Sequence, residues 1–416
     1  MKILYITQFF YPERTAGAIR AYENAINWEK GGNQVTVLTT YPNFPIGKIF
    51  KEYKNKMLSH EIIEGIDVYR SYLYMRPNTN IVNRLISYIG FPLFSIINLF
   101  ILNRKYFKGK YDVIITTSGP IFTPIIGLLF SKIRKIPLIT EFRDLTFKQI
   151  LATKFTDNNF AYKVVRGIEL FFARASDEVI VLTKGFAKIL MEYGIDKNKI
   201  DIIPNGYEIK ENNSKEDNLK KELIKKSGEI IISYFGTMGV SQNLFKIFDL
   251  ISHLKEYNNI KFLFIGDGAV KSELLKYKEE KELFNLTMLD GMPEHELEYY
   301  YQISDYCLVL LNNDQNFAYT IPSKIFQIMG RKKPIIFIGP EGEASEIINS
   351  AKCGLTLYDN EIEILKNKIL NFIKKEDTQV LGNNGYNFVL RNYNRKNLCN
   401  KYIDIINEKV LGGKKH

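Results

Sequence analysis

The sequence predicts an α/β protein with two doubly wound domains, each a parallel sheet covered by helices on both faces. Short β-branched runs alternate with longer amphipathic stretches along nearly all of the 416 residues, a pattern typical of βαβ units. The charged, apolar-poor segment 208–228 divides this alternation into two series. At about 150 residues per domain, the chain is long enough for two or three domains that each bury a core.

In the first series, buried strands are expected to alternate with helices over most of its length. The strands are expected at Lys2–Thr7, Gln34–Thr40, Val113–Thr117, Pro137–Glu141, Glu178–Leu182 and Ile200–Pro204. The helices are expected at Ala16–Lys30, Gly119–Arg134, Phe160–Ala175 and Lys184–Tyr193. Ile62–Glu64 and Asp67–Arg70, separated by Gly65 and Ile66, are expected to form a hairpin inserted in this series.

The second series repeats the pattern. Its strands are expected at Glu229–Phe235, Lys261–Ile265, Asn285–Leu289, Asp305–Leu310, Pro334–Ile338 and Gly354–Leu357. Apolar residues at helical spacing follow to the end of the chain, and these helices can pack back on the first domain. The expected organisation is a first domain over 1–207, a linker over 208–228, a second domain over 229–390 and a helical tail over 391–416.

The net charge of +11 indicates an anionic partner. Phosphorylated small molecules and acidic lipid headgroups are favoured over nucleic acid, because no nucleic-acid-binding motif accompanies the charge. Three scattered cysteines and four dispersed histidines argue against a disulfide scaffold and a zinc enzyme. The opening MKILYITQFF is better explained as a strand than as a signal peptide, so a cytoplasmic protein is expected.

One segment departs from the pattern of a soluble domain. Leu85–Asn103 contains no charge over nineteen residues and is bracketed by Arg84, Arg104, Lys105, Lys108 and Lys110. It contains Pro92 and several polar residues, and it lies inside an α/β domain, which argues against a membrane span. Two interpretations stay open, a buried helix of the first domain and an interfacial helix whose flanking cations meet anionic headgroups.

Polar residues follow several strands of the first series. The small residue Gly17 lies in the turn after the first strand, where backbone N–H groups can face an anion. Arg143 and Asp144 follow the strand ending at Glu141. Arg143 could hold a phosphate and Asp144 could accept a proton or a sugar hydroxyl, with a local ion pair as the alternative. Asn205 lies in a Pro-Asn-Gly turn that closes the domain.

In the second series, glycine-rich turns follow three strands. Gly236, Thr237 and Gly239 follow the first strand, and Gly266 and Gly268 follow the next, where backbone can approach a phosphate closely. Met292 and Pro293 follow a third strand, where a flat base could lie against the backbone. Three such turns in one domain are more informative than each alone.

The most specific segment is Thr320–Gly330. Ser323 suits a helix start, whereas Lys324 opposes the helix dipole there, and such a local conflict suggests function. Gln327 lies one turn further on the same face and could bind ribose hydroxyls. Glu343 and Glu346 begin the next helix, where they could meet sugar hydroxyls or merely complement the dipole.

Taken together, these residues resemble the family 4 retaining glycosyltransferases of the GT-B fold, most closely the O-antigen and capsule branch with its L-fucosamine-transferase-like proteins. The motifs that carry the resemblance occur in family order over nearly the whole chain: Tyr11–Glu13, Tyr41–Pro45, Arg143–Leu145, Ile203–Gly206, Gly236–Gly239, Gly266–Gly268, Pro322–Lys324 and Gly342–Glu346.

The resemblance implies two Rossmann-like domains facing across a cleft, with an acceptor bound by the first and a nucleotide-sugar donor, a UDP-sugar above others, bound by the second. It places Met292 and Pro293 by the base, Gln327 by the ribose, Gly239, Ser323 and Lys324 at the diphosphate, and Glu343 and Glu346 at the donor sugar. It also implies retention of configuration, no metal or other cofactor, and a lipid-linked acceptor at the inner face of the cytoplasmic membrane.

The chain departs from the family pattern where a glutamate is usual, at Gln327, and where tryptophan and proline are common, at Thr146 and Phe147. The lysine that many members carry near Gln242 is absent, which leaves Lys324 or Arg331 as the phosphate cation. Two other functions stay open, a nucleotide-sugar 2-epimerase and a non-catalytic membrane-associated scaffold of a glycan assembly complex.

Overall fold

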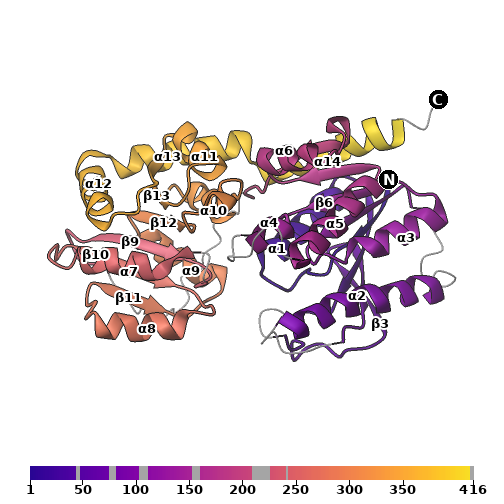
Figure 1. Ribbon diagram of the computed structural model, residues 1–416, viewed down its shortest axis with the longest axis horizontal. Helices are drawn as coiled ribbons and strands as arrows, with labels where there is room; N and C mark the ends of the chain where they lie inside the picture. The colour runs from indigo at the N-terminus through magenta and orange to yellow at the C-terminus, as the bar shows by residue number, and fades with distance from the viewer. Residues whose placement is uncertain are drawn as a thin grey trace. The chain divides into compact units, whose positions relative to one another are not determined.

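The computed structural model describes residues 1–43, 47–74, 81–102, 111–151, 160–208, 225–239 and 242–412. The chain forms two compact units. Unit 1 comprises Met1–Asn205 and Arg395–His416, and unit 2 comprises Gly206–Asn394. Each unit is a sheet with helices on both faces (Figure 1), which confirms the α/β class with two doubly wound domains. Most of the expected linker, 209–224, lies outside the described residues.

Unit 1 contains an eight-stranded sheet with the order β3-β4-β2-β1-β5-β6-β7-β8. Its pairs are parallel except β3 with β4. The strands are β1 (Lys2–Ile6), β2 (Gln34–Thr40), β3 (Leu58–Ile63), β4 (Ile66–Ser71), β5 (Val113–Ser118), β6 (Leu138–Phe142), β7 (Glu178–Val181) and β8 (Ile200–Ile202). The hairpin is confirmed as β3–β4, and it turns at Glu64 and Gly65, both with positive φ.

The helices of unit 1 cover both faces of this sheet. They are α1 (Ala16–Lys30), α2 (Ile81–Leu102), α3 (Pro124–Arg134), α4 (Thr146–Leu151), α5 (Phe160–Ala175), α6 (Lys184–Glu192) and α14 (Arg395–Ile405), which continues as a π-helical turn over Ile406–Leu411. One face of the sheet buries Ile3, Tyr5 and Val37 against α1 and α14. On the part of the chain described, α3 packs on β1, β5 and β6 and also contacts α2 and α5.

The C-terminal helix α14 packs back on unit 1, as the sequence suggested. Tyr402 and Cys399 join the core formed by α1 and the sheet. The indole Nε1 of Trp28 donates to the carbonyl of Cys399 at 3.2 Å, and Arg395 pairs with Glu23 at 2.7 Å. The last helix therefore contributes to the fold of the first unit although unit 2 separates them in sequence.

Unit 2 contains a six-stranded, all-parallel sheet with the order β11-β10-β9-β12-β13-β14. Its strands are β9 (Ile230–Phe235), β10 (Ile260–Ile265), β11 (Leu286–Leu289), β12 (Tyr306–Leu310), β13 (Ile335–Ile338) and β14 (Gly354–Leu357). Its helices are α7 (Leu244–Ser252), α8 (Lys271–Glu280), α9 (Glu294–Ile303), α10 (Lys324–Gly330), α11 (Glu343–Ala351), α12 (Ile362–Lys375) and α13 (Thr378–Asn392).

Alternate residues of these strands fill two separate cores, as expected for a sheet covered on both faces. One core packs Tyr234 and Phe264 against α7, α8 and α12, and the other packs Phe235 and Ile265 against α9, α10, α11 and α13. The strand ends that carry the predicted site residues are therefore held from both sides.

The uncharged segment Leu85–Asn103 forms most of α2, which has one buried and one exposed face. Phe91 and Ser95 are fully buried, and the Asn98 amide donates to the carbonyl of Met57 and the hydroxyl of Ser71. Ile89 and Leu93, one turn apart, are each more than half exposed. Among the described residues no helix is long and apolar enough to span a bilayer. Residues 103–110, with four of the five flanking cations, lie outside the described residues.

Candidate active site

The predicted site residues of unit 2 lie at one edge of its sheet. Because all six strands are parallel, their carboxyl ends meet at that edge, where ligands bind in doubly wound folds. The turn 236–239 follows β9, 266–268 follows β10 and 290–293 follows β11. Ser323, Lys324 and Gln327 follow β12, and Glu343 and Glu346 follow β13. The fold thus brings together segments that are more than a hundred residues apart.

The turns after β9 and β10 lie in direct contact. A side chain at either glycine of the second turn, Gly266 or Gly268, would require the backbone to move. A Cβ on Gly266 would lie 1.9 Å from the carbonyl oxygen of Gly236, and one on Gly268 would lie 2.2 Å from that of Met238. The backbone N–H of Gly236 donates to Ile265 and that of Met238 donates to Asp267, at 2.9 and 2.8 Å. Gly266 and Gly268 therefore shape the site by allowing two loops to touch.

Gly236 makes room for a cation. Its φ of +143° is rare for residues with a side chain, and a Cβ there would lie 2.6 Å from Nζ of Lys324. The same ammonium lies 4.2 Å from the ring centroid of Tyr234, at the end of β9. The hydroxyl of Tyr234 donates to the carbonyl of Thr237 at 2.7 Å. Tyr234 thus supports both the turn after β9 and Lys324.

The two candidate phosphate cations, Lys324 and Arg331, differ in their acidic partners. Arg331 pairs with Glu294 and Glu298 at 3.0 and 2.9 Å and lies over the ring of Tyr301. Within the described residues, no carboxylate pairs with Lys324. Burial alone lowers the pKa of Lys324, to about 8. Arg331 is therefore a structural ion-pair residue, and Lys324 is the cation that lacks a counter-ion.

Two backbone donors of these turns have side-chain partners. The N–H of Gly239 donates to the side-chain Oε1 of Gln242 at 3.1 Å, and the N–H of Gly291 donates to the Asp267 carboxylate at 3.0 Å. Gly291, Met292 and Pro293 follow β11, and Pro293 is the residue before the first turn of α9. The Gln242 amide occupies the donor that the resemblance assigns to the diphosphate.

The remaining predicted residues of unit 2 lie at the starts of α10 and α11. The hydroxyl of Ser323 makes no capping hydrogen bond, and Gln327 lies in the next turn with intermediate exposure. The N–H of Glu343 donates to the carbonyl of Ala318 at 2.9 Å, which ties the start of α11 to the loop after β12. Glu346 is exposed in the first turn of α11. These side chains line the same sheet edge as Lys324.

In unit 1, Arg143 is part of a buried ion network rather than an open phosphate ligand. Its guanidinium donates to Glu141 at 2.8 Å, to the carbonyl of Gly17 at 2.7 Å and to the hydroxyl of Tyr5 at 3.1 Å. Glu141, fully buried, also pairs with Arg20 at 3.0 Å. The geometry therefore matches the local ion pair that was the alternative interpretation of Arg143.

The same network accounts for two other predicted residues. A Cβ on Gly17 would lie 2.7 Å from the guanidinium of Arg143, so glycine there admits that side chain. Arg20 donates to the side chain of Asn205 at 3.3 Å and to the carbonyls of Ile203 and Pro204, both at 2.8 Å. Burial would raise the pKa of Glu141, but the two guanidinium groups outweigh it and hold that pKa below its usual value.

Asp144 lies on a turn that is anchored on both sides. Arg143 precedes it, and the buried Glu169 carboxylate accepts hydrogen bonds from the backbone N–H groups of Thr146 and Phe147 at 3.0 and 3.2 Å. Burial raises the pKa of Glu169 to about 7 despite these donors. Asp144 itself is exposed and lies just after the carboxyl end of β6, on this anchored turn.

The sequence patterns did not predict Tyr234, Glu169 or the pairing of Arg20 with Glu141. A charge inside an otherwise apolar pattern was the available signal: Glu141 lies in a buried strand, and Arg20 lies on the apolar face of α1. The signal for Tyr234 was weaker, since a tyrosine in a strand is ordinary.

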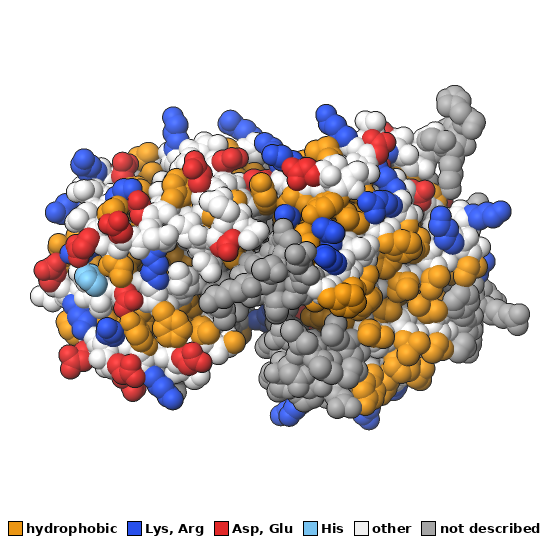
Figure 2. Space-filling view, viewed as in Figure 1, with side chains coloured by type: hydrophobic (Ala, Val, Ile, Leu, Met, Phe, Trp, Pro, Cys, Tyr) orange, Lys and Arg blue, Asp and Glu red, His pale blue; other side chains and the backbone are white. Residues whose placement is uncertain are grey.

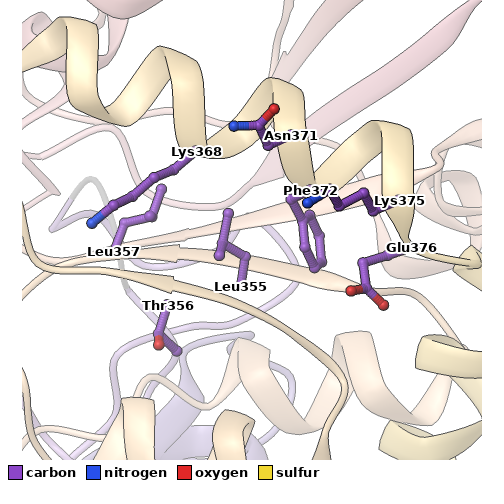
Figure 3. A pocket seen from close by; sticks show the side chains of 8 residues that line it. All are labelled: Leu355, Thr356, Leu357, Lys368, Asn371, Phe372, Lys375 and Glu376. Carbon is purple, nitrogen blue, oxygen red and sulfur yellow. The ribbon is translucent and has the colours of Figure 1, made fainter.

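A cavity of about 430 Å³ lies elsewhere in unit 2, between β14 and α12. Figure 3 shows Leu355 and Leu357 of the strand facing Lys368 and Phe372 of the helix. None of the predicted site residues lines it, and β14 is an edge strand of the sheet. The site at the carboxyl ends of the strands is therefore separate from this cavity.

Two family models match consecutive parts of the chain. The model of glycosyltransferase family 4 matches residues 18–211, and the model of group 1 glycosyl transferases matches residues 215–388. The chain belongs to the family 4 glycosyltransferases. Over 239 residues the chain is 25% identical to a probable glycosyltransferase, WbjE, of Pseudomonas aeruginosa, and the match covers 57% of the chain and 59% of that relative.

Solved structures with the same architecture show that the chain has the GT-B fold. A sucrose-phosphate synthase from Thermosynechococcus elongatus matches with a TM-score of 0.75 at 14% identity, over 98% of each chain. HepE of Anabaena, in complex with UDP and glucose, matches with 0.70 at 14% identity, over 98% of this chain and 99% of its own. WaaG, a glycosyltransferase of lipopolysaccharide biosynthesis, matches with 0.64 at 13% identity, over 97% and 99%.

Proposed function

We propose that this protein is a retaining glycosyltransferase that transfers a sugar from a UDP-sugar to a lipid-linked glycan acceptor in the biosynthesis of a surface polysaccharide. The observation that carries the proposal is the Lys324 ammonium, which lies beside the glycine turn after β9 and has no carboxylate partner in the part of the chain that the structure describes. A half-buried cation without a carboxylate partner among the described residues favours an anionic ligand. The solved relative HepE, which holds UDP and glucose, supports the choice of UDP.

The proposed donor site distributes the parts of the ligand over the carboxyl ends of β9, β11, β12 and β13. Met292 and Pro293 contact the base and Gln327 binds the ribose. The N–H of Gly239, the Ser323 hydroxyl and Lys324 bind the diphosphate, with the Gln242 amide giving way to a phosphate oxygen. Glu343 and Glu346 bind hydroxyls of the donor sugar. The turns at Gly236, Thr237, Gly266 and Gly268 hold these groups at the sheet edge.

The proposed reaction needs no protein nucleophile. The acceptor hydroxyl attacks the anomeric carbon on the face from which the diphosphate leaves, and a phosphate oxygen takes the hydroxyl proton. Lys324 stabilises the charge that develops on the departing diphosphate, a task that in this proposal falls to the protein's own groups rather than to a metal ion. Asp144, held on its anchored turn in unit 1, orients the acceptor.

A transfer assay with anomeric analysis tests the proposal. The protein is incubated with UDP-sugars and a bacterial lipid extract, released UDP is quantified, and the product is analysed by proton NMR. We expect UDP release that depends on the lipid extract and a product with the configuration of the donor. An epimerised donor formed without acceptor would indicate the epimerase. Absence of UDP release in every mixture would leave the scaffold function.

We further propose that unit 1 binds the cytoplasmic face of the membrane through α2 and α3. Ile89 and Leu93 of α2 and Leu129 and Ile133 of α3 are exposed on two helices that contact each other. Lys132, Arg134 and Lys135 at the end of α3 are also exposed. Figure 2 shows hydrophobic side chains over this part of unit 1. Apolar residues beside cations suit an anionic bilayer surface.

Sedimentation with anionic vesicles tests this surface. Leu93→Glu should reduce the bound fraction several-fold, because it places a carboxylate among the apolar residues that would enter the lipid. Binding of the wild type should also fall as ionic strength rises from about 0.1 to 1 M. Phe284→Glu is the matched control, because Phe284 is exposed in unit 2. Equal loss in both variants would contradict the assignment to α2 and α3.

A further inference from the structure

The ammonium of Lys324, at the start of α10, has an environment unlike that of Arg331, the cation that follows this helix. Arg331, at the opposite end of α10, has two glutamates. Lys324 has the face of an aromatic ring, 4.2 Å away, and no carboxylate among the described residues. A charge that is removed from water without a partner opposes folding. The charged Lys324 therefore lowers the folding stability of the unliganded protein.

Tyr234 is the residue that holds this cation. The ring is fully buried at the end of β9, where it packs on Phe264 at 5.2 Å between centroids. Its hydroxyl donates to the carbonyl of Thr237, so the same side chain fixes the turn that carries Gly236. Gly236 lacks a side chain where a Cβ would touch the ammonium. Ring, turn and ammonium thus form one rigid group.

We propose that Tyr234 positions Lys324 for the donor, and that a phosphate oxygen of the donor is the counter-ion that this ammonium lacks, so that donor binding is linked to protonation of Lys324. The inference rests on the proposed function and adds to it a positioning residue and a pH dependence. Ring and ammonium interact through the negative face of the aromatic system, which holds the cation without neutralising it.

The pH dependence follows from the groups that face Lys324. Burial lowers the pKa of Lys324 to about 8, and no other charged group among the described residues contributes to that shift. Burial also raises the pKa of Tyr234, so this phenol stays neutral. A bound phosphate favours the charged lysine and raises its pKa. Donor binding must therefore take up a proton above pH 8, and affinity should fall there by up to about tenfold per pH unit.

Titration of UDP into the intact protein between pH 7 and 9 tests the inference. The wild type should bind with constant affinity near pH 7 and progressively more weakly above pH 8. Lys324→Arg keeps the charge but does not titrate in this range, so its profile should be flat. Any titration of the nucleotide itself would affect both proteins equally.

Variants of Tyr234 separate positioning from packing. Tyr234→Leu should weaken UDP binding by roughly 2- to 30-fold and move the fall in affinity to lower pH, because the lost ring no longer favours the ammonium. Tyr234→Phe keeps the ring and should keep the position of the fall. Tyr306→Leu is the control, since Tyr306 is a buried tyrosine of the same core and its loss should change stability but not the pH profile.

The outcomes distinguish the inference from the function on which it rests. If the wild type binds UDP with an affinity that is constant from pH 7 to 9, or if Tyr234→Leu leaves the profile in place, the inference fails and the donor site stands. If the wild type binds UDP at no pH, the proposed function itself fails.

Discussion

Lys324→Met should weaken the binding of UDP by at least about 30-fold at pH 7. Removing one member of a buried charge pair costs roughly 2–5 kcal/mol, and in the proposed complex Lys324 is the cation that pairs with the diphosphate. Catalytic efficiency should fall by at least the same factor, because the charge on the leaving diphosphate grows in the transition state. Isothermal titration calorimetry measures the first effect and UDP release measures the second.

The loss should not arise from unfolding. Because burial lowers the pKa of Lys324, the unfolded chain binds a proton more strongly, and the charged lysine opposes folding below pH 8. Lys324→Met should therefore be at least as stable as the wild type at pH 7. Lys332→Met is the matched control, since Lys332 is exposed and its ammonium lies 4.8 Å from the ring of Tyr386. Equal weakening by both variants would indicate a general effect of net charge.

Arg20→Met should destabilise unit 1 by about 3–5 kcal/mol, because it leaves the buried Glu141 with a single guanidinium partner. Both side chains of the pair are at most 1% exposed, and Arg20 also donates to the Tyr402 hydroxyl of α14 at 3.2 Å. The chain contains one tryptophan, Trp28, which is buried in the same core of unit 1. Urea unfolding followed by tryptophan fluorescence therefore reports on this unit.

An exposed ion pair provides the comparison. Lys368 and Asp359 of unit 2 pair at 2.6 Å, with the lysine half exposed, so Lys368→Met should have little effect on unfolding. Stability of the wild-type unit should also decrease in acid. The pKa of Glu141 is held below its usual value, so its contribution is present at neutral pH and is lost as pH falls through the lowered pKa. A small change in the urea midpoint of Arg20→Met would contradict the role given to this network.

Strand positions were predictable because the strands of a parallel sheet are buried on both faces. Each therefore appears in the sequence as a short, continuous run of apolar, often β-branched residues. All twelve strands that were expected in the two series occur, most within two residues of their predicted bounds, and the hairpin occurs with them. The helix expected from Gly119 begins at Pro124 instead, because proline favours the first helical turn and the preceding residues form a turn that contains Pro120. The strand order depends on long-range pairing and was not predictable from local patterns.

Site residues were predictable where a strand end carries a glycine turn or an unusual charge. Lys324 was identified because a lysine is unfavourable at a helix start, and the structure adds that no acidic residue it describes pairs with this lysine. Arg143 could not be assigned from sequence, because its role depends on Glu141, Gly17 and Tyr5, and Gly17 and Tyr5 lie more than a hundred residues away. The role of Tyr234 was not predictable for the same reason, because it depends on the contact of its ring with Lys324, which follows another strand.

Calorimetric titration of UDP into the wild-type protein at pH 7, with Lys324→Met alongside, tests the central claim most directly. We expect one saturable site in the wild type and binding at least about 30-fold weaker in the variant. Equal affinity of the two proteins would place the nucleotide away from the carboxyl edge of the unit 2 sheet, and no heat of binding in the wild type would contradict a donor site altogether.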